Sequence, residues 1–250
     1  MAHGAERGAM NLTHTFMIKY TRTPTRMAPS AVEDTAPATA KNGTDKKVIK
    51  HSPGALAHVV LRSTTQNYQA MIQFYLDLLS AQIVHTTPVL TFLRYDEEHH
   101  RIAIIQTPET TPKPKHSNFA GLDHIAFTYP TLTQLAQQYT YLKSKPTDPL
   151  RPMWSVNHGP TTSMYYRDPD GNKVELQVDN FDVPEEADDF MKGPLYGMNP
   201  MGTDFDADEW AAEILSKATV VGEEGLSQDQ AKQIKTRKEI GERQDIPAGF

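Results

Sequence analysis

The sequence predicts an α+β protein built from two similar units, and three observations support this fold class. Residues 56–61 (LAHVVL) and 122–127 (LDHIAF) are matching strand-like runs. Each run is followed by a helix-like stretch, over residues 66–79 in the first unit and 132–142 in the second. The pattern at the end of each unit predicts two strands joined as a hairpin. The hairpin strands align as 92–96 with 164–168 and 99–103 with 171–175.

The hairpin of the second unit carries the clearest turn signal, at residues 168–172 (DPDGN). Pro fixes φ near −65° and Gly tolerates a positive φ, so these residues predict a tight loop. A symmetric loop places Tyr165 directly opposite Glu175, and directly opposed residues share one face of a sheet. We therefore expect Tyr165 beside Glu175 and Tyr166 in the core. The alternative is that Tyr165 is an ordinary strand aromatic that packs on a neighbour.

Two histidines and a carboxylate occupy matching strand positions and predict a metal site. In the register of the repeat, His58 and His124 are equivalent, whereas the counterpart of Glu175 is Ala103. Two His and one carboxylate typically hold one divalent metal, Fe(II) first and Mn(II) as the alternative, and leave about three coordination positions open. Either histidine alone would be read as a hydrogen-bonded core residue. A metal explains all three side chains, because a buried carboxylate needs a cation or a donor.

The composition excludes several classes of protein. The chain has 250 residues, 38% of them hydrophobic, and a net charge of −6, which suits one good core or two small ones with terminal tails. It has no window of roughly 20 apolar residues and no basic cluster, so we expect neither a membrane nor a nucleic-acid partner. The absence of Cys excludes disulfides and suits a reducing compartment, and we expect the cytoplasm.

The ends of the chain differ from its middle. Residues 1–50 are rich in Thr, Ala and Pro without periodicity and predict a disordered tail. Residues 1–27 carry four basic residues and one acidic residue, which weakly resembles a mitochondrial targeting segment. The alternative is an unstructured extension, or a start at Met27.

Residues 182–250 form a predicted C-terminal extension that is partly helical. A short helix is expected near 182–186, and residues 206–217 predict an amphipathic helix. Residues 223–250 are charged and poorly patterned, so we expect them to wrap the surface or to reach a partner subunit in a homo-oligomer. The apolar face of the amphipathic helix would consist of Trp210, Ile214 and Leu215.

Residues 55–180 resemble the vicinal oxygen chelate superfamily, and more closely its one-domain extradiol ring-cleavage dioxygenases. The DPDGN hairpin with a following Glu carries the first resemblance, and residues 98–104 (EHHRIAI), which resemble the paired-His segment of the extradiol enzymes, carry the second. The resemblance implies two βαβββ modules, about 55–107 and about 121–180, paired into a cupped mixed sheet around the metal. The domain would span residues 51–181.

The resemblance also implies catalytic roles around the metal. His100 corresponds to an active-site acid–base, and Tyr165 to a tyrosine that hydrogen-bonds the bound catecholate. His158 lies near the place of a further active-site histidine, with a longer spacing to Tyr165 than expected. Side chains alternate between the two faces of a strand, and His100 lies an odd number of positions from Ala103, so it would point away from the metal-facing side. A β-bulge would be needed to turn it toward the metal, and without a bulge His100 is a solvated turn residue. The implied metal ligands are His58, His124 and Glu175.

The implied activity is cleavage of a catecholic ring with O₂, with a small aromatic diol as substrate. Two alternatives remain open. One is a glyoxalase-like lyase or isomerase, whose metal usually has four protein ligands, an arrangement that Ala103 disfavours. The other is a non-enzymatic small-molecule binding protein, which predicts no bound metal.

Overall fold

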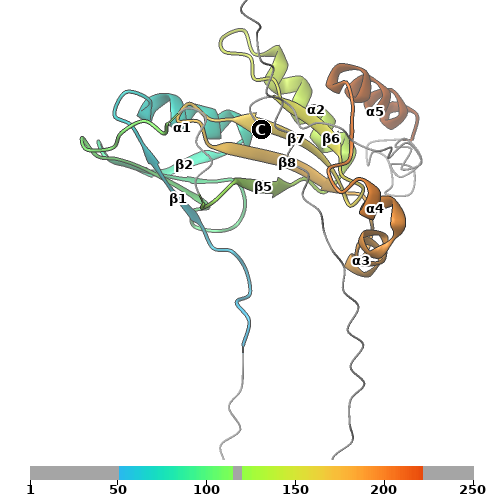
Figure 1. Cartoon of the computed structure of the whole chain (residues 1–250). Helices are drawn as coiled ribbons and strands as arrows, with labels where there is room; N and C mark the ends of the chain where they lie inside the picture. The colour runs from blue at the N-terminus through green and yellow to red at the C-terminus, as the bar shows by residue number, and fades with distance from the viewer. Residues whose placement is uncertain (1–50, 115–119, 222–250) are drawn as a thin grey trace, which may run out of the picture. The chain divides into compact units, whose positions relative to one another are not determined.

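The computed structural model describes residues 51–114 and 120–221, and Figure 1 shows their arrangement. The predicted disordered tail, the targeting segment within it and the predicted surface segment 223–250 lie outside the described residues. No helix in the described ranges is long and apolar enough to cross a membrane.

The predicted α+β class and the two modules are confirmed, because the strands form two mixed sheets of the same order. The first sheet has four strands in the order β1-β4-β3-β2, and the second has five in the order β5-β8-β7-β6-β9. Their bounds are β1 (Val59–Ser63), β2 (Gln82–Thr86), β3 (Leu90–Arg94), β4 (Ile102–Gln106), β5 (His124–Thr128), β6 (Trp154–Asn157), β7 (Thr161–Arg167), β8 (Lys173–Asp179) and β9 (Thr203–Asp204).

One helix crosses from the first strand of each module to its hairpin. These helices are α1 (Tyr68–Leu78) and α2 (Leu132–Ser144), close to the predicted bounds. The side chain of Thr131 caps α2 by accepting from the backbone N–H of Gln134, which satisfies a donor that the first turn leaves free. Both helices bury an apolar stripe with the inner residues of the sheets in one core, which includes Tyr166 as predicted.

The described part of the C-terminal extension packs on the second module. Helices α3 (Pro184–Lys192) and α4 (Pro194–Met198) lead to β9, which pairs with β6, and then to α5 (Ala207–Val221). Helix α5 lies beside α2 in Figure 1 and in the residue contacts. Trp210 and Ile214 enter the shared core, and Leu215 packs against it, as the predicted amphipathic face requires.

The turn between β7 and β8 has the predicted geometry. Gly171 has φ +88°, the left-handed region that favours glycine. The carboxylate of Asp168 accepts from the backbone N–H groups of Asp170 and Asn172 at 3.1 and 2.8 Å. The ladder that follows pairs Tyr165 with Glu175, as predicted.

The same turn ties the two modules together. The hydroxyl of Tyr75, on α1, donates to Asp168 Oδ2 at 3.0 Å, and both residues are buried. Asn67 Nδ2 and Thr64 Oγ1 donate to Asp170 Oδ1 at 2.8 and 3.1 Å. The DPDGN turn therefore holds the start of α1 as well as its own hairpin.

Strand β1 begins later than predicted. Residues 56–58 were expected in the strand, but it starts at Val59, and His58 lies just before it. Arg101 Nη1 donates to the carbonyls of Leu56 and Ala57 at 2.8 and 3.0 Å, so these groups bond to a side chain instead of a neighbouring strand. In the second module β5 likewise starts late, and His124 is its first residue.

The register of the repeat is confirmed at the positions of the candidate metal ligands and is wrong in the first hairpin. Val60 pairs with Ala103 as Ala126 pairs with Glu175, so Ala103 is the counterpart of Glu175. However, Ala103 faces Phe92, so Phe92 and not the next residue occupies the place of Tyr165. The alignment failed because the loop 95–101 is longer than the loop 168–172.

Candidate functional site

A histidine and a buried glutamate meet on the second sheet. His124 opens β5, and Glu175 lies on the adjacent strand β8, beside Ala126. The distance from His124 Nε2 to Glu175 Oε2 is 3.1 Å, and Glu175 is only 4% exposed. The structure thus brings together two of the three predicted metal ligands.

A second carboxylate orients the imidazole of His124. Asp123 Oδ1 lies 2.8 Å from His124 Nδ1, and Lys173 Nζ lies 2.8 Å from Asp123 Oδ2. A carboxylate on one ring nitrogen is the usual partner of a histidine whose other nitrogen binds a metal. The contact directs Nε2 of His124 toward Glu175.

The ionisation of the pair follows from these contacts. Burial raises the pKa of the Glu175 carboxyl, but hydrogen bonds from His124 and Ser163 outweigh burial and hold the pKa below its usual range. The hydrogen bond to Glu175 raises the pKa of His124, against the opposing effect of burial. Glu175 is therefore an anion at neutral pH, although it is buried.

The donor set of this pair fits a divalent metal. Ligand atoms at about 2.0–2.2 Å from one ion, at right angles, lie about 3 Å apart, which is the spacing of His124 Nε2 and Glu175 Oε2. A cation between the two atoms would replace the proton that they now share. The carboxylate of Asp123 behind the ring completes the arrangement.

Tyr165 lies on the same face of the sheet, directly opposite Glu175 on β7. Burial first, and the charge of Glu175 second, raise the pKa of Tyr165 far above its usual value, so the hydroxyl stays protonated. The ring of Tyr165 also meets the ring of His124 edge-on, with centroids 5.4 Å apart. The predicted place of Tyr165 beside the carboxylate is confirmed.

His158 belongs to this cluster in spite of its spacing along the chain. It lies in the turn between β6 and β7, and its Nε2 is 2.9 Å from the hydroxyl oxygen of Tyr165. Its Nδ1 is 2.8 Å from the backbone carbonyl of Met201. Because a carbonyl only accepts, Nδ1 carries the proton, and in the neutral ring Nε2 is an acceptor that faces the hydroxyl of Tyr165.

Sequence reasoning missed Trp154, which stacks on Tyr165. Their ring centroids are 5.2 Å apart with an interplanar angle of 22°, and Trp154 meets His158 edge-on at 5.5 Å. The indole N–H donates to Asp204 Oδ1 at 2.8 Å. The available signal was the run before His158, in which a strand aromatic lies four residues ahead of a candidate histidine.

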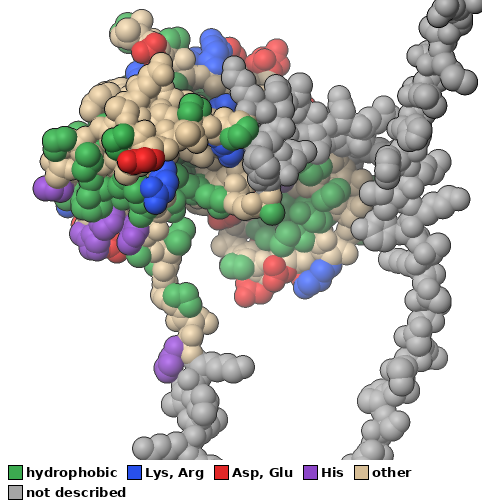
Figure 2. All heavy atoms as spheres, turned by 60° about the vertical axis from the view of Figure 1, so that its left-hand side comes forward, with side chains coloured by type: hydrophobic (Ala, Val, Ile, Leu, Met, Phe, Trp, Pro, Cys, Tyr) green, Lys and Arg blue, Asp and Glu red, His purple; other side chains and the backbone are tan. Residues whose placement is uncertain are grey.

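The remaining two candidates, His58 and His100, lie together on the first sheet. The ring of His100 is 4.5 Å from the rings of both His58 and Phe92. Figure 2 shows His side chains gathered beside hydrophobic ones on this surface. The β3–β4 ladder has no register shift, so the bulge that would turn His100 toward the metal is not present. His100 lies in the loop before β4, and its predicted catalytic role stays a prediction.

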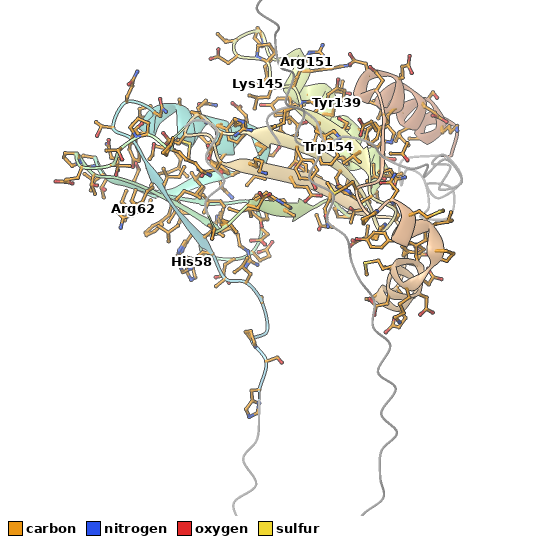
Figure 3. All side chains as sticks on the ribbon, viewed as in Figure 1. His58, Arg62, Tyr139, Lys145, Arg151 and Trp154 are labelled. Carbon is orange, nitrogen blue, oxygen red and sulfur yellow. The ribbon has the colours of Figure 1, made fainter. Side chains whose placement is uncertain are left out.

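The structure does not place His58 with His124 and Glu175. Within residues 51–114 and 120–221, no three His, Cys, Asp or Glu side chains form a group that could hold a metal ion. Figure 3 shows His58 at the start of β1, away from Trp154 on the second sheet. The third ligand therefore stays a prediction.

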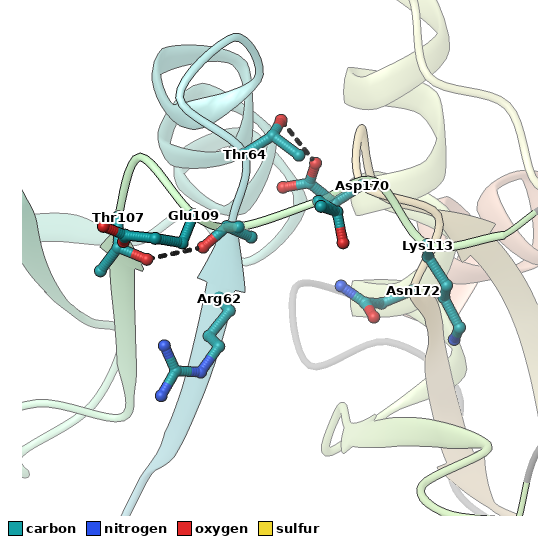
Figure 4. A pocket seen from close by; sticks show the side chains of 9 residues that line it. Arg62, Thr64, Thr107, Glu109, Lys113, Asp170 and Asn172 are labelled. Carbon is teal, nitrogen blue, oxygen red and sulfur yellow. Dashed lines mark hydrogen bonds between the residues drawn. The ribbon is translucent and has the colours of Figure 1, made fainter.

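A hollow of about 400 Å³ lies between the modules, and none of the candidate residues lines it (Figure 4). Arg62 and Lys113 supply positive charges, and Glu109 and Asp170 supply negative ones. Asp170 Oδ1 is held by the hydroxyl of Thr64. This polar hollow is separate from the cluster around Glu175.

The sequence comparisons agree with this geometry. The sequence pattern of the Glyoxalase/Bleomycin resistance protein/Dioxygenase superfamily matches residues 55–176. Two relatives from Rhodococcus globerulus, biphenyl-2,3-diol 1,2-dioxygenase 2 and 3, are each 47% identical to this chain over 150 residues, which cover 60% of this chain and 76% of each relative.

Solved structures with a similar arrangement are more distant. A lactoylglutathione lyase from Agrobacterium tumefaciens is 20% identical, with a TM-score of 0.37 over 51% of this chain and 96% of the lyase. A glyoxalase/dioxygenase from Nostoc punctiforme is 20% identical, with a TM-score of 0.39 over 52% of this chain and 97% of its own. On the 47% identity to the two relatives and the pattern match over both modules, the chain belongs to the Glyoxalase/Bleomycin resistance protein/Dioxygenase superfamily.

Proposed function

We propose that this protein is an extradiol dioxygenase, which opens a catecholic ring with O₂ beside its two hydroxyl groups. The observation that carries the proposal is the 47% identity to two proteins named biphenyl-2,3-diol 1,2-dioxygenase, over 76% of their length. The substrate is a small aromatic diol. The acidic net charge and the lack of a basic cluster in the sequence argue against a nucleic-acid partner.

The metal would be Fe(II), with Mn(II) as the alternative, held by His124 and Glu175. His58 is the proposed third ligand, which requires the start of β1 to approach the second sheet. When bound, the metal would supply open positions for the diol and O₂ and a path for electrons between them. The buried anionic Glu175 and the oriented ring of His124 support this assignment.

The roles of the surrounding side chains follow from their contacts. Tyr165 keeps its proton and lies beside Glu175, so its hydroxyl can hold an oxygen of the diol. His158 presents Nε2 to that hydroxyl and is placed to receive a proton from a diol oxygen held there. Trp154 covers the ring of Tyr165 and excludes water from that side.

His100 is the second candidate for the acid–base role. It contacts His58 and Phe92 on the first sheet and not the cluster around Glu175. If His58 joins the metal, His100 comes with it, because their rings are 4.5 Å apart. The two candidates for the acid–base role thus come from different modules.

The compartment and the assembly belong to the same proposal. A chain without Cys suits the cytoplasm, with mitochondria as the alternative that the basic residues of 1–27 suggest. A homo-oligomer would form through the C-terminal extension. In the described part of that extension, α5 packs on α2 and β9 pairs with β6.

Oxygen consumption tests the function directly. Protein purified without air and loaded with Fe(II) is mixed with biphenyl-2,3-diol or catechol in an oxygen electrode. We expect one O₂ per substrate and a yellow ring-opened product, and no reaction after chelation of the metal. Conversion that proceeds equally without O₂ would indicate a lyase or isomerase. Tight binding of the diol without conversion would indicate a binding protein.

A further inference from the structure

We propose that the segment Asn199–Asp204 is a positioning element for His158 and Tyr165. It lies beyond the region matched by the superfamily pattern, which ends at residue 176. The inference rests on the proposed dioxygenase function, because it assigns this segment to the same site. Two separate contacts, one to His158 and one to Trp154, carry it.

The first contact fixes the tautomer of His158. The carbonyl of Met201 accepts from Nδ1 at 2.8 Å, which leaves Nε2 of the neutral ring as the acceptor toward Tyr165, 2.9 Å away. The other neutral tautomer would set a lone pair against a carbonyl oxygen and turn an N–H toward the tyrosine. The backbone of Met201 therefore decides which kind of ring nitrogen, an acceptor or a donor, His158 presents to the hydroxyl of Tyr165.

The carbonyl of Met201 is held in place by a rigid turn. Asn199 is 3% exposed, accepts from the N–H of Gly202 at 2.9 Å and donates to the carbonyl of Gly202 at 2.9 Å. Gly202 has φ +89°, and a Cβ there would lie 2.1 Å from the carbonyl oxygen of Asn157. Only glycine lets the segment approach the backbone before His158 this closely.

The second contact fixes the ring that covers Tyr165. Asp204 accepts from the indole N–H of Trp154 at 2.8 Å, and β9 pairs Asp204 with Val156 on the same strand as the indole. Trp154 is 5% exposed, stacks on the ring of Tyr165 and meets the ring of His158 edge-on. The segment thus contacts two of the three packed rings, His158 through Met201 and Trp154 through Asp204, and the third ring is Tyr165.

The variants separate positioning from folding. Asp204→Ala removes one side-chain acceptor, Asp204→Asn keeps it, and Gly202→Ala pushes the segment away from His158. For Asp204→Ala we expect kcat to fall about tenfold, the worth of one hydrogen bond, with KM within about twofold of wild type. Asp204→Asn should restore kcat. Asp188→Ala, an exposed carboxylate on α3, is the matched control and should change neither constant.

The tautomer of His158 supplies a readout that does not depend on turnover. ¹⁵N NMR of the imidazole in Zn(II)-loaded protein should show a protonated Nδ1 in wild type and a mixture of tautomers in Gly202→Ala. A wild-type ring protonated on Nε2 alone, or normal kcat in both Asp204→Ala and Gly202→Ala of an active enzyme, would overturn the proposal. A wild type that cleaves no diol but has the expected tautomer overturns the dioxygenase function and leaves the positioning inference standing.

Discussion

At the scale of single residues, the site is asymmetric because its two modules place different side chains at equivalent positions. Glu175 and Ala103 are equivalent in register, as are Tyr165 and Phe92. The second sheet therefore carries the anion and its hydroxyl partner, whereas the first offers apolar groups and His58. Of these four equivalent positions, only that of Glu175 carries a charge.

The assignment of the acid–base role can be decided between two histidines. General acid–base groups contribute about 10² to 10⁴ in rate, so loss of the true one should lower kcat by that factor with iron content near normal. We expect this loss for His158→Ala, because its Nε2 already faces Tyr165. His100→Ala is the paired variant. A large loss in His100→Ala with normal turnover in His158→Ala would transfer the role to the first module.

At the scale of elements, the DPDGN turn is a tie between modules as well as a hairpin loop. Asp168 is buried and takes hydrogen bonds from two backbone groups of its own turn and from the hydroxyl of Tyr75 on α1. Because both modules donate hydrogen bonds to the one carboxylate of Asp168, the end of β7 is held at a fixed position against α1. That relation sets where β8, and hence Glu175, lies against the first module.

Removal of the Tyr75 hydroxyl should show the strength of this tie. In Tyr75→Phe a buried hydrogen bond to a carboxylate is lost, which typically costs about 1.5–3 kcal/mol. We expect the free energy of unfolding, measured with urea, to fall by that amount. Tyr95→Phe, at a residue that is 41% exposed, is the control and should cost less than about 0.5 kcal/mol. If Tyr75→Phe lowers the free energy of unfolding by less than about 0.5 kcal/mol, the turn does not depend on its hydrogen bond from α1.

Helix α5 is held on α2 by charge as well as by its apolar face. Asp208 lies 2.5 Å from Lys143 Nζ and 3.1 Å from Arg151 Nη1, and it accepts from the hydroxyl of Tyr139 at 2.7 Å. The hydrogen bond from Lys143 first, then those from Tyr139 and Arg151, lower the pKa of Asp208. A carboxylate with a lowered pKa in the folded state stabilises the fold wherever it is ionised.

Acid should therefore remove this contribution. It is fully present above the unfolded pKa of Asp, about 3.9, and is lost as the pH falls through the lowered pKa of the folded state. We expect Asp208→Asn to lower Tm at pH 7, with an unchanged difference from wild type down to about pH 5 and a smaller one below about pH 4. A difference that grows on acidification would contradict the sign of the pKa change.

At the scale of the whole molecule, the sequence predicts what local chemistry determines. The DPDGN turn and the pairing of Tyr165 with Glu175 followed from the demand of Gly171 for a positive φ and from the symmetry of the loop. The contact of Met201 with His158 could not be predicted, because every residue has a backbone carbonyl and the residue type does not show which one accepts a hydrogen bond. The relation of His58 to Glu175 could not be predicted either, since it depends on how two sheets close on each other.

Metal binding tests that closure, because a shared ion would link the two modules. A ligand that binds only the folded state adds about 2.7 kcal/mol of stability at 100 times its Kd. We expect Fe(II) or Mn(II), added without air, to raise the Tm of wild type. The rise should vanish in Glu175→Gln, which keeps the shape of the side chain but loses the charge, and should be much smaller in His58→Ala.

Two further variants help to interpret a small metal-dependent rise in Tm. Glu185→Gln, on α3, removes an exposed carboxylate and should leave the metal-dependent rise in Tm intact. Asp123→Asn should weaken metal affinity by about 10–100-fold, because it removes the carboxylate that orients His124. If His58→Ala retains one equivalent of metal and the full rise in Tm, the ion is held by the second module alone. The first sheet would then contribute only the apolar wall around the aromatic ring.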